Sequence, residues 1–143
     1  MSRQNIELLE RMYTAFNRGQ FSTVMDAIDP DVEWRITSEA GPAPGTYHGH
    51  KGMRRVLDSF HDVWGEYQDT PLEFIDEGDY VVARICSEGT GRRSGAEVAE
   101  EFAHLWEIRE GKVVRFQAFR ESVNALDAAG IDSSRLHTED DGR

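Results

Sequence analysis

Cysteine, basic residues and long apolar runs are all scarce in this chain. Its 143 residues include one cysteine, Cys86, so no disulfide can form within the chain, and we expect a reducing, cytoplasmic location. The 16 lysines and arginines are outnumbered by 27 acidic residues, which leaves a formal net charge of -11. Phosphate backbones and anionic membranes attract clustered positive charge, so we expect neither nucleic acid nor a membrane as a partner.

Signals for export, membrane insertion, metal binding and cofactor binding are also lacking. The first residues show no basic-then-apolar signal pattern, and no apolar run approaches the ~20 residues that span a bilayer. His48 and His50 lie two apart with no further ligand pair, so we expect no metal site. The glycine-rich segment 89–95 lacks the Gly-Lys-Ser/Thr ending of a phosphate-binding loop. We expect no cofactor.

The first half of the chain has the periodicity of helices. Apolar residues at three- and four-residue steps predict a helix over about 2–18 that ends at Gly19. A shorter helix follows with Ser22 as its candidate N-cap. Residues 31–36 alternate weakly, as a strand does, and the clearest helix is predicted from Lys51 to Tyr67. The apolar stripe of that helix comprises Met53, Val56, Leu57, Phe60, Val63 and Trp64.

The second half of the chain alternates with a period of two. This pattern predicts strands over 72–77, 80–88, 101–109 and 112–120, then a short helix over 122–129 capped by Gly130. Helices followed by a run of strands favour one α+β domain, residues 1–131, with a mostly antiparallel sheet curved around its helices. Residues 132–143 are polar and acidic, and we expect them to be disordered.

Three local patterns, taken in order, resemble the NTF2-like superfamily and its SnoaL-like branch. They are residues 13–20 ahead of 31–34, residues 47–49 before the helix 52–64, and residues 104–114 followed by 125–130. The resemblance covers about 2–131 and implies a cone-shaped, cystatin-like fold whose hollow holds a small hydrophobic molecule. The superfamily includes ketosteroid isomerases, dehydratases, polyketide cyclases, epoxide hydrolases and non-enzymatic binding modules, so the fold does not determine the activity.

Pairing the last two strands across the turn Glu110-Gly111 predicts which side chains share a face. The expected pairs are His104 with Gln117, Trp106 with Arg115, and Phe102 with Phe119. The resemblance places this face inside the hollow. The opposite face would carry Ala103, Leu105, Val114, Phe116 and Ala118. An apolar outer face needs a cover, so we expect a homodimer through the sheet.

His104 and Glu121 are the candidate catalytic residues. In ketosteroid isomerases the strand position that resembles His104 holds the acid that donates a hydrogen bond to the substrate oxyanion. A histidine there can donate or shuttle a proton near neutral pH; the alternative is a core histidine bonded to Gln117 or to a backbone carbonyl. Glu121 stands where SnoaL-like proteins commonly carry an acid that serves as a base. Its alternative role is to stabilise the start of the last helix.

Other active-site groups of the superfamily do not match this chain. Trp34 stands in place of the isomerase base, an aspartate, and Met12 in place of the oxyanion tyrosine, with Tyr13 one residue later. The epoxide hydrolase arginine needs two flanking carboxylates, but Arg84 is followed two residues later by Cys86. We expect Arg84 to form an ion pair with Glu107 or Glu88 instead.

The expected ligand-binding residues are those placed in the hollow: Tyr13, Trp34, Phe60, Trp64, Phe102, Trp106, Arg115, Gln117 and Phe119. For the aromatic members, plain core packing is the alternative. We expect the protein to bind a small hydrophobic molecule, a polyketide- or steroid-like ring, and as an enzyme to isomerise, cyclise or dehydrate it. The alternative is a non-catalytic ligand-binding or dimerisation module. Because Trp34 stands where an isomerase has its aspartate base, the sequence favours this module over an isomerase.

Overall fold

The computed structural model describes residues 2–40 and 44–136. The elements in chain order are α1 (Ser2–Asn17), α2 (Phe21–Asp26), β1 (Ile28–Ile36), β2 (Gly45–His48), α3 (Gly49–Val63), β3 (Trp64–Glu77), β4 (Tyr80–Gly91), β5 (Glu97–Arg109), β6 (Lys112–Phe119), α4 (Ser122–Ala129) and the 3-10 turn η1 (Ser133–Arg135). The strands form one six-stranded sheet in the order β2-β1-β6-β5-β4-β3. Only the pair β1 and β6 is parallel among the described strand pairs.

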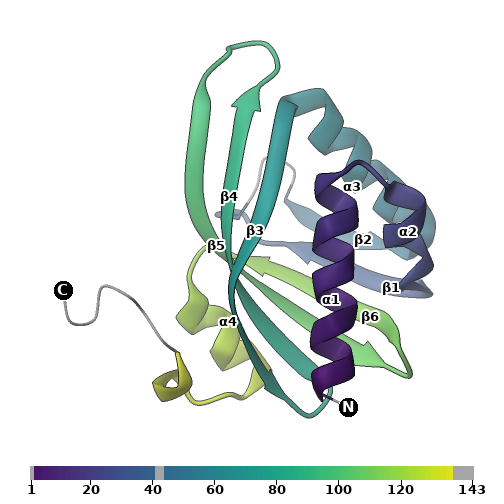
Figure 1. The fold of residues 1–143 in the computed structure, drawn as a ribbon, viewed down its shortest axis with the longest axis vertical. Helices are drawn as coiled ribbons and strands as arrows, with labels where there is room; N and C mark the ends of the chain where they lie inside the picture. Colours follow the sequence, from purple (N-terminus) through teal and green to yellow (C-terminus); the bar gives the residue numbers. More distant parts are fainter. Residues whose placement is uncertain (1, 41–43, 137–143) are drawn as a thin grey trace.

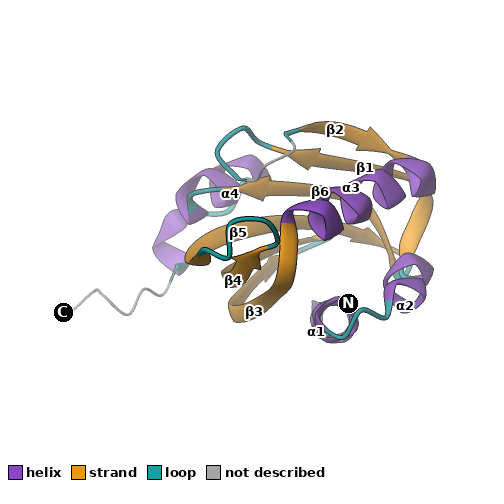
Figure 2. Cartoon of the chain, turned by 90° about the horizontal axis from the view of Figure 1, so that it is seen from above, coloured by secondary structure: helices purple, strands orange, loops and turns teal. Residues whose placement is uncertain are grey.

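Helices cover both faces of a strongly curved sheet (Figure 1). Figure 2 shows the sheet bending around α3 on its concave side, where α1 and α2 also lie. On this side Leu9 of α1 and Val56 of α3 join one apolar cluster with Trp106 of β5. The expectation of an α+β fold with a curved, mostly antiparallel sheet wrapped around helices is confirmed.

The last helix covers the convex face of the sheet. Leu126 of α4 packs in a second apolar cluster with Val82 of β4 and with Ala103 and Leu105 of β5. The apolar side of β5 was the reason to expect a homodimer, and α4 of the same chain covers it instead. The homodimer stays a prediction that this face does not support.

Local signals predicted some element ends well and others badly. The last helix has the expected bounds, and Gly130 caps it in the left-handed conformation with φ of 74°. The helix expected to run to Tyr67 ends at Val63, because β3 pairs with β4 all the way from Trp64 opposite Gly91. Pairing with β4, which has register shifts after Trp64 and at Leu72, overrides the helical spacing of Trp64. The short helix begins one residue before Ser22, with Gln20 as its N-cap.

A β-bulge in β6 changes the register of the final hairpin. Next to the turn, Arg109 pairs with Lys112 and Ile108 with Val113, as expected. Glu107 then pairs with Arg115, so Val114 is an extra residue without a partner. Beyond it the expected pairs are wrong by one residue: His104 lies opposite Ala118, Trp106 opposite Phe116, Leu105 opposite Gln117, and Ala103 opposite Phe119. One extra residue moves every later side chain of β6 to the other face.

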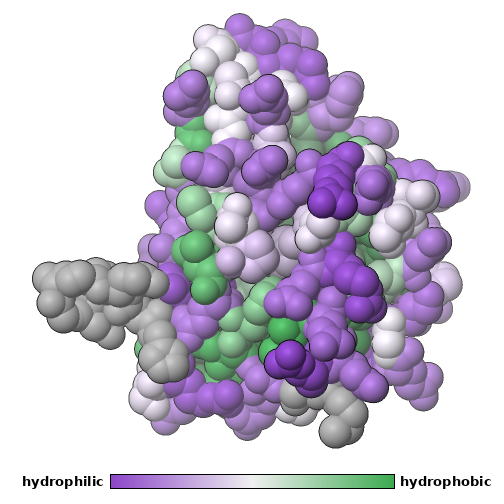
Figure 3. All heavy atoms as spheres, viewed as in Figure 1, coloured by the Kyte–Doolittle hydropathy of each residue, from purple (hydrophilic) through white to green (hydrophobic). Residues whose placement is uncertain are grey.

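The end of the described chain is held against the sheet. Residues 133–135, part of the segment expected to be disordered, form the turn η1, and Arg135 donates to a carboxylate oxygen of Glu77 at 2.8 Å. The remainder of that segment, 137–143, lies outside the described residues. Hydrophilic residues dominate the face drawn in Figure 3, in keeping with the acidic composition. None of the described helices combines the length and apolarity that crossing a membrane requires.

Candidate active site

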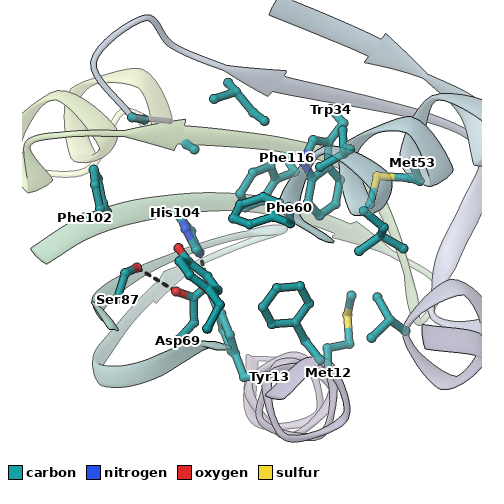
Figure 4. Close-up of a pocket in the computed structure, with 18 of the residues that line it drawn as sticks. Met12, Tyr13, Trp34, Met53, Phe60, Asp69, Ser87, Phe102, His104 and Phe116 are labelled. Carbon is teal, nitrogen blue, oxygen red and sulfur yellow. Dashed lines mark hydrogen bonds between the residues drawn. The ribbon is translucent and has the colours of Figure 1, made fainter. Parts of the chain in front are cut away.

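A small cavity lies between α1, α3 and the concave face of the sheet (Figure 4). Its volume is about 90 Å³. Most of its wall is hydrocarbon and aromatic ring: Met12, Phe16, Val24, Trp34, Ile36, Ala40, Met53, Val56, Leu57, Phe60, Phe102, Trp106, Phe116 and Ala118. The polar side chains in the wall are Tyr13, Ser59, Tyr67, Asp69, Ser87 and His104. Figure 4 shows Asp69, Ser87, Tyr13 and His104 gathered at one end of the cavity.

Tyr13, His104 and Trp106 form a hydrogen-bonded group at that end. The hydroxyl of Tyr13, on α1, lies 2.7 Å from Nδ1 of His104 on β5. The same hydroxyl accepts a bond of 3.0 Å from Nε1 of Trp106, two residues along β5. The phenol and imidazole rings are nearly parallel, with centroids 5.8 Å apart. The alternation of β5 brings both rings to one face, and the apolar stripe of α1 brings Tyr13 to meet them.

This group is neutral at physiological pH and leaves one hydrogen-bond donor for a ligand. Burial lowers the pKa of His104 from 6.5 to about 3. Burial, with the nearby Asp69 charge as a smaller cause, raises the pKa of Tyr13 well above 10.0. If Tyr13 donates to Nδ1, the imidazole carries its proton on Nε2; if Nδ1 carries the proton and donates, the phenol O–H is released. In either tautomer one N–H or O–H is left to a molecule in the cavity.

Asp69 is the buried acid of the cavity. It lies on β3, is 7% exposed, and accepts a hydrogen bond of 2.6 Å from Oγ of Ser87 on β4. Burial raises the pKa of Asp69 from 3.8 to about 6, while hydrogen bonds from Ser87 and Tyr67 oppose that rise. A carboxyl group with a pKa near neutrality in an apolar cavity is suited to accept and return protons.

Asn17 holds the backbone of Asp69 in place. The amide nitrogen of Asn17 donates to the carbonyl of Asp69 at 2.8 Å, and the backbone N–H of Asp69 donates to the Asn17 oxygen at 2.9 Å. Asp69 lies on the edge strand β3, so its outward backbone groups have no neighbouring strand to pair with. The last residue of α1 therefore serves as the missing partner at the position that carries the acid.

The sequence of this chain matches the model of the SnoaL-like domain over residues 9–116. This chain belongs to the SnoaL-like domain family. An NTF2-like protein of Burkholderia pseudomallei is 25% identical, with 87% of this chain and 95% of that chain covered and a TM-score of 0.75. TerC, crystallised with polyporic acid, is 29% identical over 87% of this chain and 96% of that chain, with a TM-score of 0.74.

A third solved structure shares the fold at lower identity. IdmH, a candidate polyketide cyclase of Streptomyces antibioticus, is 23% identical over 87% of this chain and 97% of that chain, with a TM-score of 0.69. No curated protein matches this chain. Membership of the SnoaL-like family confirms the resemblance found in the sequence, and the solved structures confirm the NTF2-like fold.

The cavity of this SnoaL-like protein is lined by six of the side chains expected there: Tyr13, Trp34, Phe60, Phe102, His104 and Trp106. Trp34, at the position of the isomerase base, stacks on Phe116 with ring centroids 3.9 Å apart, so it forms wall. Met12 also lines the cavity, but Tyr13 supplies the hydroxyl group that meets His104.

Five expected site residues lie elsewhere in this SnoaL-like protein. The bulge in β6 turns Arg115, Gln117 and Phe119 away from the cavity, and the same shift brings Phe116 and Ala118 into its wall. Trp64 lies on β3 and lines an outer groove instead of the cavity. Glu121 is exposed at the N-cap of α4, although it makes no side-chain cap bond there.

Arg84 forms an ion pair, but with other partners than expected. Its guanidinium lies 3.1 Å from a carboxylate oxygen of Glu73 and 2.5 Å from one of Glu101. It lies two residues from Val82 on β4, on the convex side of the sheet, so it does not line the cavity. Arg84 therefore lies between two carboxylates, but on the face of the sheet opposite the cavity. Among the described residues no cluster of three histidine, cysteine or acidic side chains could hold a metal ion.

Asp69, Ser87 and Tyr67 line the cavity but are not among the residues expected there. The sequence predicts a helix that ends at Tyr67 and a strand that begins at Leu72. Asp69 then falls in the loop between them, where no periodicity assigns its side chain to one face of the sheet. The available signal was the apolar alternation of β4 at 81, 83 and 85, which continues to Ser87 on the same face. Extending the hairpin around Gly78 in regular register would place Thr70 opposite Ser87. A β-bulge at Leu72 shifts the pairing by one residue and brings Asp69 opposite Ser87 instead.

Proposed function

We propose that this SnoaL-like protein binds a small organic molecule with a ketone group in the cavity and moves a proton at the carbon beside that group, without a cofactor. The observation that carries the proposal is the buried Asp69, with a pKa raised to about 6, in one cavity with the neutral donor of Tyr13 and His104. Above that pKa the carboxyl is ionised, and burial makes it a stronger base than an exposed carboxylate.

The step moves one proton and one electron pair. The Asp69 carboxylate takes a proton from the carbon beside the carbonyl, and the electrons of the broken C–H bond form an enolate whose negative charge rests on oxygen. That oxygen receives the hydrogen bond that Tyr13 and His104 leave available. The Asp69 carboxylic acid then returns the proton to another carbon, which isomerises the molecule. If the enolate carbon instead attacks a second carbonyl of the same molecule, a C–C bond closes a ring, the electrons of the carbonyl π bond move to its oxygen, and that oxygen takes the proton back from Asp69.

In this proposal Asp69 takes the part that the sequence analysis gave to Glu121, and His104 acts as a neutral hydrogen-bond donor. The apolar wall supports a hydrophobic ligand. The relative TerC supports a small organic ligand for this fold, because it was crystallised with polyporic acid. A cytoplasmic location is part of the proposal and is supported by the single cysteine.

Allyl methyl ketone tests the reaction, because moving its double bond next to the carbonyl produces a conjugated ketone that absorbs in the ultraviolet. We expect turnover by the wild-type protein, with kcat/KM rising as the pH passes about 6. Asp69→Asn should lower kcat/KM about a hundredfold or more, which is the usual loss when a general base is removed. The matched control is Asp58→Asn, the same change at an exposed position of α3 outside the cavity.

Two results decide against catalysis by Asp69. Equal turnover by wild type and Asp69→Asn would remove the base from the proposal. No turnover by any variant, together with binding of the saturated analogue methyl propyl ketone, would favour the alternative of a non-catalytic ligand-binding module. Quenching of tryptophan fluorescence reports that binding, because Trp34 and Trp106 line the cavity.

A further inference from the structure

The cavity that holds the candidate active site is too small for a complete ring system. Its volume is about 90 Å³, and we refer to it as the inner chamber. A protein cavity that accommodates benzene measures about 150 Å³. The inner chamber therefore accepts a fragment smaller than a benzene ring, such as a ketone group with its neighbouring carbons. The rest of any larger substrate has to extend beyond it.

Two further hollows lie next to each other on the side of the inner chamber where Tyr67 and Phe60 stand. A middle recess of about 250 Å³ shares Ala40, Phe60, Tyr67, Ser87 and Phe102 with the chamber. An outer groove of about 860 Å³ shares Phe60, Trp64, Tyr67, Gly89 and Val98 with the recess. Each hollow shares lining residues with the next, so the three are adjacent, and an elongated ligand that occupied all of them would follow one path. It leads from Asp69 toward the ends of β3, β4 and β5 that project together at the top of Figure 1.

Aromatic rings form much of the wall of the recess and the groove. The rings of Trp64 and Tyr67 lie 5.3 Å apart, and both lie against Gly89 of β4. A Cβ atom on Gly89 would lie 2.8 Å from the ring of Trp64 and 2.9 Å from the ring of Tyr67. Glycine at this position therefore allows both rings to pack directly against the backbone of β4. In the described part of the chain Nε1 of Trp64 is buried without a hydrogen-bond partner.

Negative charge surrounds the recess and the groove. Their linings include five exposed glutamates: Glu39, Glu66, Glu88, Glu97 and Glu100. Across residues 2–40 and 44–136, none of the five forms an ion pair. Arg92 lines the groove too, but its guanidinium donates to the backbone carbonyls of His61 and Trp64. A negatively charged group on a ligand would therefore be repelled here.

We propose that the recess and outer groove bind the tail of the substrate whose ketone end occupies the inner chamber. The substrate is an elongated ketone whose apolar tail carries no negative charge. It is therefore bound as a free molecule and not while it is attached to a negatively charged carrier. This inference rests on the proposed function for the position of the ketone. It adds the substrate class and a second binding region, formed by β3, β4, β5 and the end of α3.

Binding of three ketones that lack a movable double bond tests the tail site without depending on turnover. Methyl propyl ketone places its carbonyl group in the chamber and extends only a short way beyond it, benzyl propyl ketone adds an aromatic tail, and the para-sulfonate of benzyl propyl ketone gives that tail a negative charge. In the wild-type protein we expect the benzyl tail to tighten Kd about tenfold or more, since it removes apolar surface from water. The sulfonate should lose most of that gain at low salt and recover part of it at high salt.

Two variants with the same chemical change localise the effect. Val98→Trp fills the recess and the groove from β5, yet Val98 does not line the inner chamber. We expect this variant to bind methyl propyl ketone as the wild type does and to lose the gain from the benzyl tail. Val123→Trp is the control on the exposed side of α4, where Val123 is 47% exposed, and it should leave all three affinities unchanged.

The results separate this proposal from the proposed function. An undiminished benzyl gain in Val98→Trp, or a sulfonate that binds as tightly as the neutral ketone at low salt, overturns the tail site. Asp69-dependent turnover of allyl methyl ketone alongside either result leaves the proposed function standing and rejects the tail site alone. If no ketone binds, both proposals fall, whatever the state of the groove.

Discussion

Burial of Asp69 predicts that part of the protein's stability is lost as the pH rises. In the unfolded chain the carboxyl titrates near 3.8, and burial raises the pKa of Asp69 in the folded protein to about 6. Between these values the folded protein holds a proton that the unfolded chain has released. The contribution to the free energy of unfolding is therefore fully present below about pH 3.8 and is lost as the pH passes 6. A difference of about two pKa units corresponds to about 3 kcal/mol.

His104 has the opposite effect over the same pH range. Burial lowers its pKa to about 3, so below pH 6.5 the unfolded chain gains a proton that the folded protein does not accept. Its contribution to stability is present above pH 6.5 and is lost as the pH falls toward 3. Each group alone changes the free energy of unfolding by about 1.4 kcal/mol per pH unit. Between pH 4 and 6 the two slopes have opposite signs and cancel.

Single substitutions should make the two slopes visible. Urea unfolding followed by tryptophan fluorescence between pH 4 and 8 gives the free energy of unfolding of each variant. Relative to Asp69→Asn, the wild type should lose about 2.5 kcal/mol between pH 4 and 7, most of the total difference. Relative to His104→Gln, the wild type should instead gain stability over the same interval. Comparison with the wild type cancels the effect of the acidic surface, which all the variants share.

One result would refute this reasoning. If the difference between wild type and Asp69→Asn stays constant from pH 4 to 7, the carboxyl titrates as an exposed aspartate does, and the base of the proposed function is lost with it. Asp58→Asn, the same change at an exposed position on α3, is the matched control for the loss of one negative charge.

Two further substitutions test the polar end of the cavity. Tyr13→Phe removes the hydroxyl that accepts from Trp106 Nε1, so it should lower the free energy of unfolding by about 1–3 kcal/mol in urea denaturation at pH 7; an unchanged value would contradict the buried hydrogen bond. Asn17→Asp keeps the oxygen that accepts from the N–H of Asp69, but it replaces the donating amide with a carboxylate oxygen that faces the Asp69 carbonyl. This variant should therefore lower the free energy of unfolding more at pH 7 than at pH 4. Arg18→Ala, at the next residue, should show no such pH dependence.

Local signals in the sequence determined much of the fold. The turn Glu110-Gly111, the helix 122–129 with its cap at Gly130, and the common face of His104 and Trp106 all follow from neighbours within a few residues. Such features depend on backbone conformation and on the two-residue period of a strand, so a sequence without any relatives is sufficient to predict them. The family patterns then indicated the curved sheet and the hollow beneath it.

Tertiary structure alone decided the membership of the site. The extra residue Val114 moves the side chains of β6 that follow it to the opposite face of the sheet. The local alternation of apolar and polar residues does not predict one unpaired residue. Asp69 became the acid of the cavity because Asn17 of α1 and Ser87 of β4 hold it, 52 and 18 residues away along the chain. Its raised pKa and the lowered pKa of His104 come from burial by those distant segments. A sequence specifies which groups can titrate, whereas the packing around each group sets the pH at which it does so.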